Sequence, residues 1–178
     1  MKQFIYILTG VLLLSACSRS SLEAEKSTID SLLLAYQKLE AQVESMSTDE
    51  AKEHLATYKT SIELIKKNTN PNKMPSMESS RFIDAFRSVK KTFKKLPKKQ
   101  STLTQHIATN SEQLENLLED IRNNLLSSNK LEEILTQEKI LLNDVRSSYQ
   151  LIVRGMEEEK EKLDSLVILL PTELEKLR

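Results

Sequence analysis

Apolar residues recur at intervals of three and four along almost the whole chain, and this spacing restricts the fold more than any other feature. Such spacing places apolar side chains along one face of an α-helix, whereas a strand needs strict alternation. The chain has only 2 glycines and no tryptophan, so the residues that favour tight turns and strands are scarce. The sequence therefore predicts an all-α fold.

The first apolar stripe begins at Leu22 and is interrupted at Ser47. It resumes out of register after Ser47, Thr48, Asp49 and Glu50, which have the form of a capping box at a helix start. We therefore expect a kink or a break at Ser47. The stripe comprises Leu22, Ile29, Leu32, Tyr36, Leu39, Val43 and Met46 before this point, and Ala51, Leu55, Tyr58, Ile62 and Ile65 after it.

Residues 68–77 contain two prolines among asparagine and serine residues, so we predict a loop there in which the chain reverses. The next stripe passes Pro97 without changing phase, and the helix is expected to bend there but to stay roughly in line. Its members are Phe82, Phe86, Val89, Phe93, Leu96, Gln100, Leu103, Ile107, Asn110, Leu114, Leu117 and Ile121.

A second short connection is predicted at Ser127, Ser128, Asn129 and Lys130, with Asn129 and Glu132 as a capping pair. A third stripe then runs from Leu131 to Leu170 through Gly155 in one phase. Pro171 is expected to end this helix or to start a last turn. Asn110 and Glu138 fall on otherwise apolar stripes, where they are expected to lie at bundle ends or to fix the register of the helices.

Three arms of roughly 45 to 50 residues, reversed at two loops, predict an elongated antiparallel three-helix bundle with kinked or broken arms. Breaks at Ser47 and Pro97 would permit an alternative, a compact bundle of five or six shorter helices. In either case residues 22–178 are expected to form a single helical-bundle domain. Coiled-coil-like stripes can close within one chain or between chains, so the sequence leaves the oligomeric state open.

The chain has 26 Lys plus Arg and 26 Asp plus Glu, yet residues 81–99 contain eight basic residues and a single acid, Asp84. The phenylalanines of this segment lie on the opposite side of the same predicted helix. The segment is either a surface for anionic headgroups, a polyanion or an acidic partner, or the solvent face of a core helix. The candidate surface for an anionic partner comprises Arg87, Lys90, Lys91, Lys94, Lys95 and Lys98.

The sequence offers little material for catalysis or for metal binding. A metal site in a helical bundle usually combines Glu and His side chains at helical spacing, and the only histidines are His54 and His106. Glu50 precedes His54 by four residues, but no further ligands accompany this pair. No Ser-His-Asp set, glycine-rich phosphate loop or redox cysteine pair can be assembled. We therefore predict no enzyme activity, metal or cofactor.

The first residues have the order of a bacterial export leader. Lys2 precedes an apolar segment from Phe4 to Leu14, which as a helix spans only about 16 Å, against roughly 30 Å for the hydrocarbon core of a bilayer. Leu14, Ser15, Ala16 and Cys17 close this segment. Residues 1–18 thus resemble the signal peptide and lipobox of bacterial lipoproteins.

This resemblance implies that residues 1–16 are a signal peptide, cleaved after Ala16, and that Cys17 is the lipidation site. The Cys17 sulfur would carry a diacylglyceryl group, and the new amino group an acyl chain such as palmitate, which together anchor a protein stably to a membrane. Residues 17–21 are expected to be a short lipidated tether. Ser18 resembles the outer-membrane sorting signal of Gram-negative lipoproteins.

Together these features predict a membrane-anchored cell-envelope lipoprotein with a structural or protein-binding role. In a Gram-negative cell it is expected on the outer membrane rather than the inner one, facing the periplasm or the cell surface. An envelope protein is the expected partner, and the location disfavours nucleic acid. The alternative is a periplasmic ligand carrier or chaperone that uses an apolar groove and the basic segment 81–99. A lined cavity would favour a carrier, and a concave apolar and basic surface would favour a chaperone.

Overall fold

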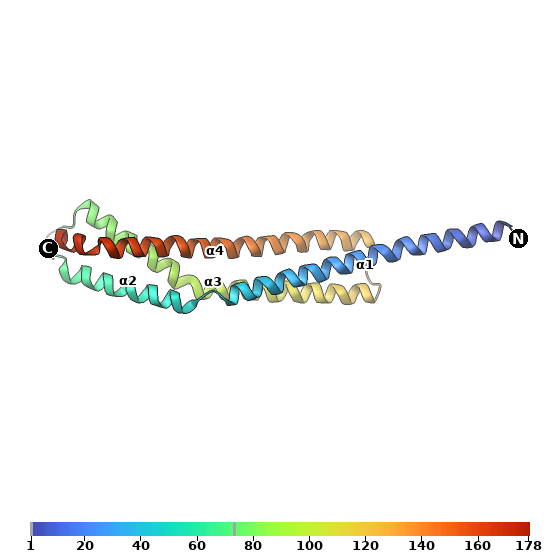
Figure 1. The fold of residues 1–178 in the computed structure, drawn as a ribbon, viewed down its shortest axis with the longest axis horizontal. Helices are drawn as coiled ribbons and strands as arrows, with labels where there is room; N and C mark the ends of the chain where they lie inside the picture. Colours follow the sequence, from blue (N-terminus) through green and yellow to red (C-terminus); the bar gives the residue numbers. More distant parts are fainter. Residues whose placement is uncertain (1, 73) are drawn as a thin grey trace. The chain divides into compact units, whose positions relative to one another are not determined.

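The structure is a computed structural model that describes the backbone of residues 2–72 and 74–178 and the side chains of residues 23–72 and 74–178. The described residues form four α-helices and no strand: α1 (Lys2–Glu44), α2 (Thr48–Asn68), α3 (Met77–Arg122) and α4 (Ser128–Leu177) (Figure 1). The prediction of an all-α fold is confirmed. The helices described are fewer than the five or six of the alternative arrangement.

The first arm is broken at Ser47, where the sequence predicted a kink or a break. Ser47 is the N-cap of α2: its backbone is extended, and its Oγ accepts a hydrogen bond from the Glu50 amide at 3.0 Å. This bond satisfies one of the amides that the first turn of a helix leaves unpaired. Asp49 and Glu50 also place negative charge at the positive end of the helix dipole.

A side chain of α3 stabilises the chain where α1 ends. Gln100 Nε2 donates hydrogen bonds to the carbonyl oxygens of Val43, at 2.8 Å, and of Met46, at 3.4 Å. Carbonyl groups in the last turn of a helix have no partner within the helix, so a side-chain amide can take that place. This role explains why a polar residue stands on the apolar stripe of α3.

The turn between α3 and α4 lies at residues 123–127, earlier than the connection predicted at 127–130. α3 ends in a Schellman motif: the Asn124 amide donates to Ile121 O at 3.2 Å, and the Leu125 amide donates to Asp120 O at 3.0 Å. Asn124 has a φ of 53°, a left-handed conformation that asparagine tolerates better than most residues. The predicted capping pair with Asn129 is wrong, because Asn129 lies inside α4.

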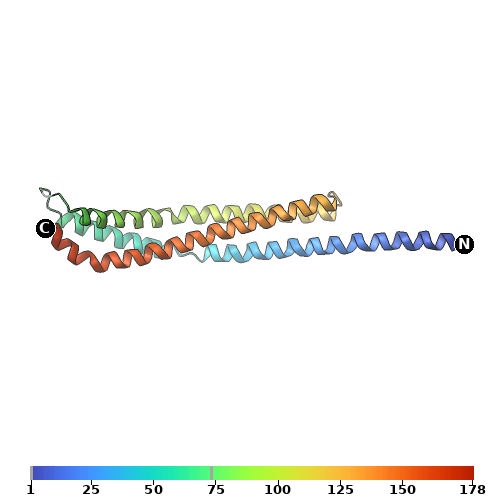
Figure 2. The ribbon, with the colours of Figure 1, turned by 90° about the horizontal axis from the view of Figure 1, so that it is seen from above.

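Pro97 and Pro171 both lie inside helices, α3 and α4, whose ribbons are continuous (Figure 2). The prediction that Pro171 ends the third helix or starts a last turn is therefore wrong. Leu170 and Leu177 are buried on either side of this proline, and Leu177 O accepts a hydrogen bond from the Asn70 amide at 3.2 Å. These contacts hold the residues that follow the proline in place, although the proline removes one helical hydrogen bond.

The contacts divide the chain into two compact units. The first unit comprises the chain up to Gln42 and the segment Thr104–Arg146. Segments of α1, α3 and α4 meet in this unit, and the predicted stripes supply its core. The buried apolar side chains are those of Ile29, Leu32, Tyr36, Leu39, Ile107, Leu114, Leu117, Ile121, Leu131, Leu135, Leu142 and Val145.

The second unit comprises Val43–Leu103 and Ser147–Arg178. Its core is more aromatic, and the Phe82 and Phe86 rings meet edge to face with their centroids 5.3 Å apart. The apolar side chains buried in this unit are Val43, Met46, Ala51, Tyr58, Ile65, Phe82, Phe86, Val89, Phe93, Leu96, Leu103, Leu163, Leu166, Leu170 and Leu177. That residues 22–178 form one domain stays a prediction.

Residues 14–17, which resemble a lipobox, lie in α1, but the Cys17 side chain lies outside the described residues, so its lipidation stays a prediction. Residues 17–21, which we expected to form a tether, have a helical backbone. At about 1.5 Å per residue, a helical segment of five residues is only about 7 Å long. Among the residues that the structure describes, no helix has the length and apolar character needed to cross a membrane.

Candidate functional site

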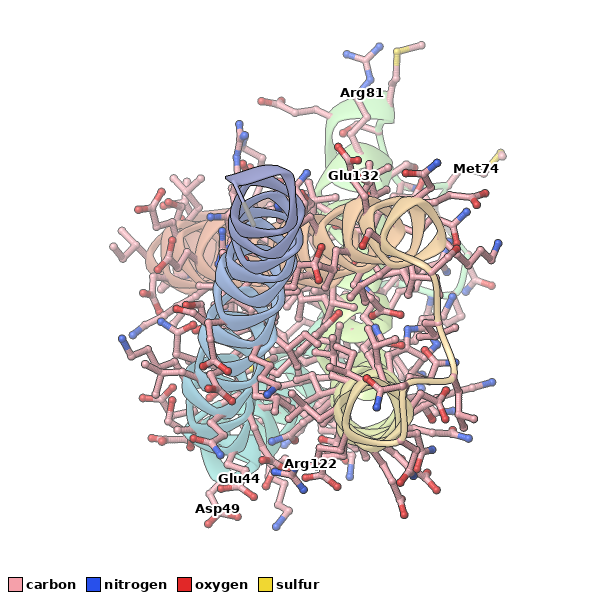
Figure 3. The ribbon with its side chains drawn as sticks, turned by 90° about the vertical axis from the view of Figure 1, so that its right-hand side faces the viewer. Glu44, Asp49, Met74, Arg81, Arg122 and Glu132 are labelled. Carbon is pink, nitrogen blue, oxygen red and sulfur yellow. The ribbon has the colours of Figure 1, made fainter. Side chains whose placement is uncertain are left out.

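The basic residues of segment 81–99 all lie on the exposed side of α3, within the second unit. Arg81 projects outward from the helix (Figure 3). The buried side of the same segment carries the three phenylalanines, each at most 9% exposed. Burial of these rings therefore turns the cations toward solvent. We term the following residues the basic surface: Arg81, Arg87, Lys90, Lys91, Lys94, Lys95, Lys98 and Lys99.

Two cations of the basic surface have partners within the described part of the chain. Arg87 Nη1 lies 2.7 Å from Asp84 Oδ1, and both side chains are largely exposed. Lys90 Nζ lies 5.6 Å from the centroid of the Tyr58 ring on α2, a cation–π contact. Exposed ion pairs contribute only about 0–1 kcal/mol. Because Asp84 is the single acid among the eight cations of residues 81–99, most of the positive charge of this surface is uncompensated.

An open groove lies between α2 and α3, beside the basic surface, with a volume of about 550 Å³. We term it the α2–α3 groove. Its apolar lining is Tyr58, Ile62, Ile65 and Ile83, and its polar lining is Thr69, Lys66 and Arg87.

The groove divides the surface predicted for an anionic partner into two groups. Arg87 lines the groove, and Lys90 lies over Tyr58, which also lines it. Lys91, Lys94, Lys95 and Lys98 are exposed but do not line it. The sequence analysis missed the groove. Ile83 could have indicated it, because this apolar residue follows Phe82 directly and lies outside the regular apolar stripe of α3.

His54 packs against an aromatic ring. Its ring centroid lies 4.8 Å from that of Phe93, with an angle of 41° between the ring planes. Within the ranges that the structure describes, no three His, Cys, Asp or Glu side chains lie close enough together to hold a metal ion. His54 thus covers part of a buried phenylalanine, which gives this half-buried histidine a packing role.

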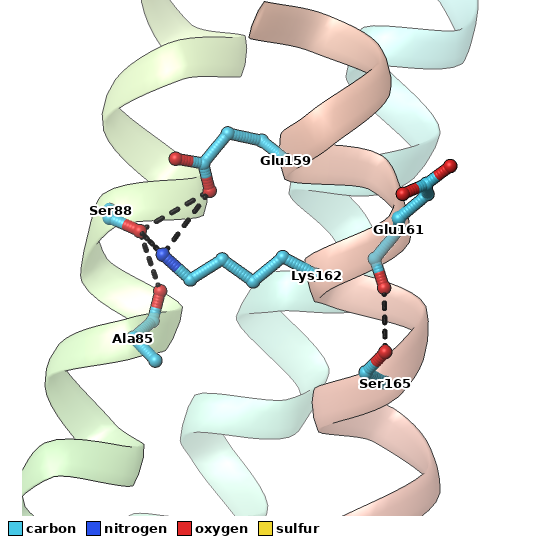
Figure 4. A network of polar contacts seen from close by, with 6 residues as sticks. All are labelled: Ala85, Ser88, Glu159, Glu161, Lys162 and Ser165. Atoms are coloured by element: carbon cyan, nitrogen blue, oxygen red, sulfur yellow. Dashed lines mark hydrogen bonds and ion pairs between the residues drawn. The ribbon is translucent and has the colours of Figure 1, made fainter.

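A polar network joins α3 to α4 within the second unit (Figure 4). The Lys162 ammonium donates to Ser88 Oγ and also lies 3.7 Å from Glu159 Oε2. The Ser88 hydroxyl lies within hydrogen-bonding distance of Glu159 Oε2, at 3.2 Å, and of Ala85 O, at 3.0 Å. A serine nucleophile needs hydrogen-bond donors aimed at the developing oxyanion. Ser88 lies in mid-helix, where neighbouring amides are engaged in helical hydrogen bonds, so we interpret this network as a structural link.

The first unit contains a buried polar cluster with one residue from each of three helices: Tyr36 of α1, Asn110 of α3 and Glu138 of α4. Asn110 Nδ2 donates a hydrogen bond to Tyr36 Oη at 3.0 Å. Burial raises the pKa of the Glu138 carboxyl. Burial also raises the pKa of Tyr36, an effect that the hydrogen bond from Asn110 opposes and the charge of Glu138 reinforces.

This cluster lies in the core of the first unit, so Asn110 and Glu138 do not lie at an exposed end of a helix pair. Glu138 Oε2 is buried, and it has no hydrogen-bond partner among the described residues. Buried polar residues on helical stripes can select one register of packing at a cost in stability. The cluster therefore has the position expected of residues that fix helix register.

Among the described residues, the basic surface and the adjoining α2–α3 groove combine positive charge with apolar surface, and we take them as the candidate site for a ligand or partner. Its cations come from α3 and α2, and its apolar floor comes from the same two helices. No protein-family model matches this chain, and neither a curated protein nor a solved structure matches it.

Proposed function

We propose that this protein is a non-catalytic lipoprotein of the bacterial cell envelope, anchored to a membrane through lipid on Cys17. The order Leu14, Ser15, Ala16, Cys17 after an apolar segment supports this anchor, because that order resembles a lipobox. Two or three acyl chains hold a protein on a bilayer where one chain gives only marginal binding. Ser18 favours the outer membrane in a Gram-negative cell.

Within this location we propose a structural or protein-binding role. The observation that carries the binding role is the basic surface, whose eight cations are exposed and accompanied by the single acid Asp84 within residues 81–99. Buried phenylalanines hold this segment on the core, so its charges are presented from a fixed helix. An uncompensated surface of one sign speeds encounter with a partner of opposite sign. The proposed partner is therefore an envelope protein with an acidic surface.

The same proposal includes the finer architecture, an elongated antiparallel three-helix bundle. The lengths of α3 and α4, 46 and 50 residues, support it, because helices of this length extend about 70 Å. Each of them also contributes residues to both compact units. A bundle of this kind would present the basic surface away from its core.

Crosslinking in intact cells, followed by purification of the full chain, tests the binding role. The test variant changes Lys91, Lys94, Lys95 and Lys98 to glutamine. The control variant makes the same change at four exposed lysines elsewhere, Lys38, Lys59, Lys139 and Lys160. We expect the test variant to lose most of a specific crosslinked envelope protein and the control to retain it.

The binding proposal fails if both variants recover the crosslinked protein as well as the unaltered chain does. Salt gives a second measure of the binding. The screening length is about 10 Å at 0.1 M ionic strength and shorter above it, so contacts between exposed charges weaken as salt is added. Recovery of the complex from lysates of cells that were not crosslinked should therefore decrease as salt is raised. A salt-independent complex would indicate an apolar interface instead.

A ligand carrier is the second candidate function, and one observation favours it. The α2–α3 groove combines an apolar floor with cations, which is the arrangement expected of a carrier for an amphiphile. Retention of a small molecule by the purified full chain is the corresponding measurement. A chain that retains none when incubated with candidate amphiphiles would leave only the protein-binding role.

A further inference from the structure

The α2–α3 groove has the size and chemistry of a site for a small amphiphile. We propose that it binds a lipid with a single acyl chain and an anionic headgroup. The inference deepens the ligand-carrier function by naming the ligand class. It is independent of the protein-binding role, because a lipid would occupy the groove whether or not the rest of the basic surface meets a protein.

The apolar lining of the groove suits an acyl chain. Tyr58 and Ile65 are buried, whereas Ile62 and Ile83 are only half-buried and so leave apolar surface for a ligand to cover. Covering such surface with methylene groups is favourable and needs no directional contacts. A chain of methylenes therefore matches this lining better than a polar ligand does.

The volume of the groove favours a small ligand over a folded protein. Small-molecule sites usually measure about 300–1,000 Å³, and the groove measures about 550 Å³. A stable protein interface uses about 20–30 residues from each partner, many more than line this groove. The limited volume also favours one acyl chain over two.

The cations at the groove select the charge of the headgroup. Lys66 and Arg87 line it, and Lys90 lies over Tyr58 with its Nζ 5.6 Å from the ring centroid. In the described part of the chain, neither lysine forms an ion pair, and Arg87 pairs only with the exposed Asp84. The guanidinium fork of Arg87 fits the paired oxygens of a carboxylate or a phosphate. The groove therefore favours an anionic headgroup over a zwitterionic one.

Native mass spectrometry of the full chain in a non-ionic detergent tests this proposal. The two anionic probes are oleate and oleoyl-lysophosphatidylglycerol, and the zwitterionic comparator is oleoyl-lysophosphatidylcholine. We expect one molecule of either anionic probe to bind saturably, and the comparator to bind at least tenfold more weakly. Dioleoyl-phosphatidylglycerol, which carries two chains, should also bind more weakly.

Two triple variants with the same change in charge locate the binding. Lys66→Gln, Arg87→Gln and Lys90→Gln together remove the cations at the groove and should weaken binding of the anionic probes at least tenfold. Lys94→Gln, Lys95→Gln and Lys98→Gln remove three cations of the basic surface outside the groove and should leave binding within about twofold of the unaltered chain. Far-UV circular dichroism checks that both variants keep their helix content.

A third variant, Ile83→Trp, fills the apolar floor and leaves every charge in place. It should abolish saturable binding of the anionic probes. Equal losses in the two triple variants would overturn the proposal, because attraction to the whole basic surface would then explain the binding. Equal affinity for the zwitterionic comparator would overturn it too. Neither outcome bears on the protein crosslinks, which are tested with lysines outside the groove.

Discussion

Replacing Glu138 by glutamine should stabilise the protein at neutral pH. The Glu138 side chain is only 7% exposed, and its Oε2 is buried without a hydrogen-bond partner among the described residues. An unsatisfied buried polar group costs about 1–3 kcal/mol, and a charged one costs more. Glutamine has nearly the same shape, so the change removes the charge without opening a cavity. The glutamine amide stays buried and polar, so the gain is the difference between a buried charge and a buried neutral group. We therefore expect Glu138→Gln to raise the free energy of unfolding at pH 8 by about 1 kcal/mol.

The gain should depend on pH with a defined sign. Burial raises the folded-state pKa of Glu138 above its ordinary value of 4.5, so over the interval between these values the folded protein holds a proton that the unfolded chain releases. The stabilising contribution of this proton is complete below the ordinary value and is lost as pH rises through the raised value. The glutamine side chain of the Glu138→Gln variant does not titrate, so its stability does not fall over this interval for this reason. The two proteins should therefore be similarly stable near pH 4 and diverge above it.

Urea denaturation followed by circular dichroism, at several pH values between 4 and 8, measures this difference. For a chain of this size, 1 kcal/mol corresponds to about 2–4 °C in melting temperature, so thermal melts provide a second readout. Glu115→Gln is the matched control, since Glu115 is exposed on α3 and its replacement should change little. Parallel stability curves for Glu138→Gln and the unaltered chain, or a less stable variant at pH 8, would refute the reasoning.

Substitutions at three further positions test the helix boundaries and the core, each by urea denaturation. Ser47→Ala removes the hydroxyl that accepts a hydrogen bond from the Glu50 amide at 3.0 Å, so it should lower the free energy of unfolding by about 1 kcal/mol. Ser47→Asp keeps an acceptor there and should be close to neutral. Equal losses in the two variants would contradict the capping role. Pro97→Ala restores a backbone donor inside α3 and should stabilise the protein by up to about 3 kcal/mol, whereas a loss would show that Pro97 is needed there. Phe86→Ala empties a fully buried site and should cost about 3–5 kcal/mol, and a cost below about 1 kcal/mol would argue against the described core.

Much of the fold was predictable because buried apolar side chains follow helical spacing. Ile29, Tyr36, Phe86, Leu114 and Leu163 lie on the predicted stripes, and each is at most 1% exposed. The break at Ser47 was predictable as well, since a capping serine and a shift of phase are both local signals.

Two boundaries could not be predicted, because each depends on contacts or conformations that local patterns do not encode. Asn124 stops α3 by adopting a left-handed conformation, yet nothing in residues 121–125 separates this asparagine from those at 123 and 129. At Pro171, the hydrogen bond between Asn70 and Leu177 joins residues more than a hundred positions apart. A rule that ends helices at proline cannot take such a distant contact into account.

The candidate site was predictable only in part, for a related reason. The exposure of Lys94, Lys95 and Lys98 follows from their spacing opposite the phenylalanines on one helix. The groove needs Ile62 and Lys66 of α2 beside Ile83 and Arg87 of α3, and the sequence does not specify which turns of two helices face each other. Periodicity gives the faces of a helix but not the neighbour that covers them.

The most direct test of the central claim, that the protein is a lipoprotein anchored at Cys17, is its intact mass after extraction from bacterial membranes with detergent. The account predicts a chain that begins at Cys17 and carries one diacylglyceryl group and one further acyl chain, with both lost in Cys17→Ala. A chain that retains residues 1–16, or one that begins at Cys17 with a free thiol, would contradict it.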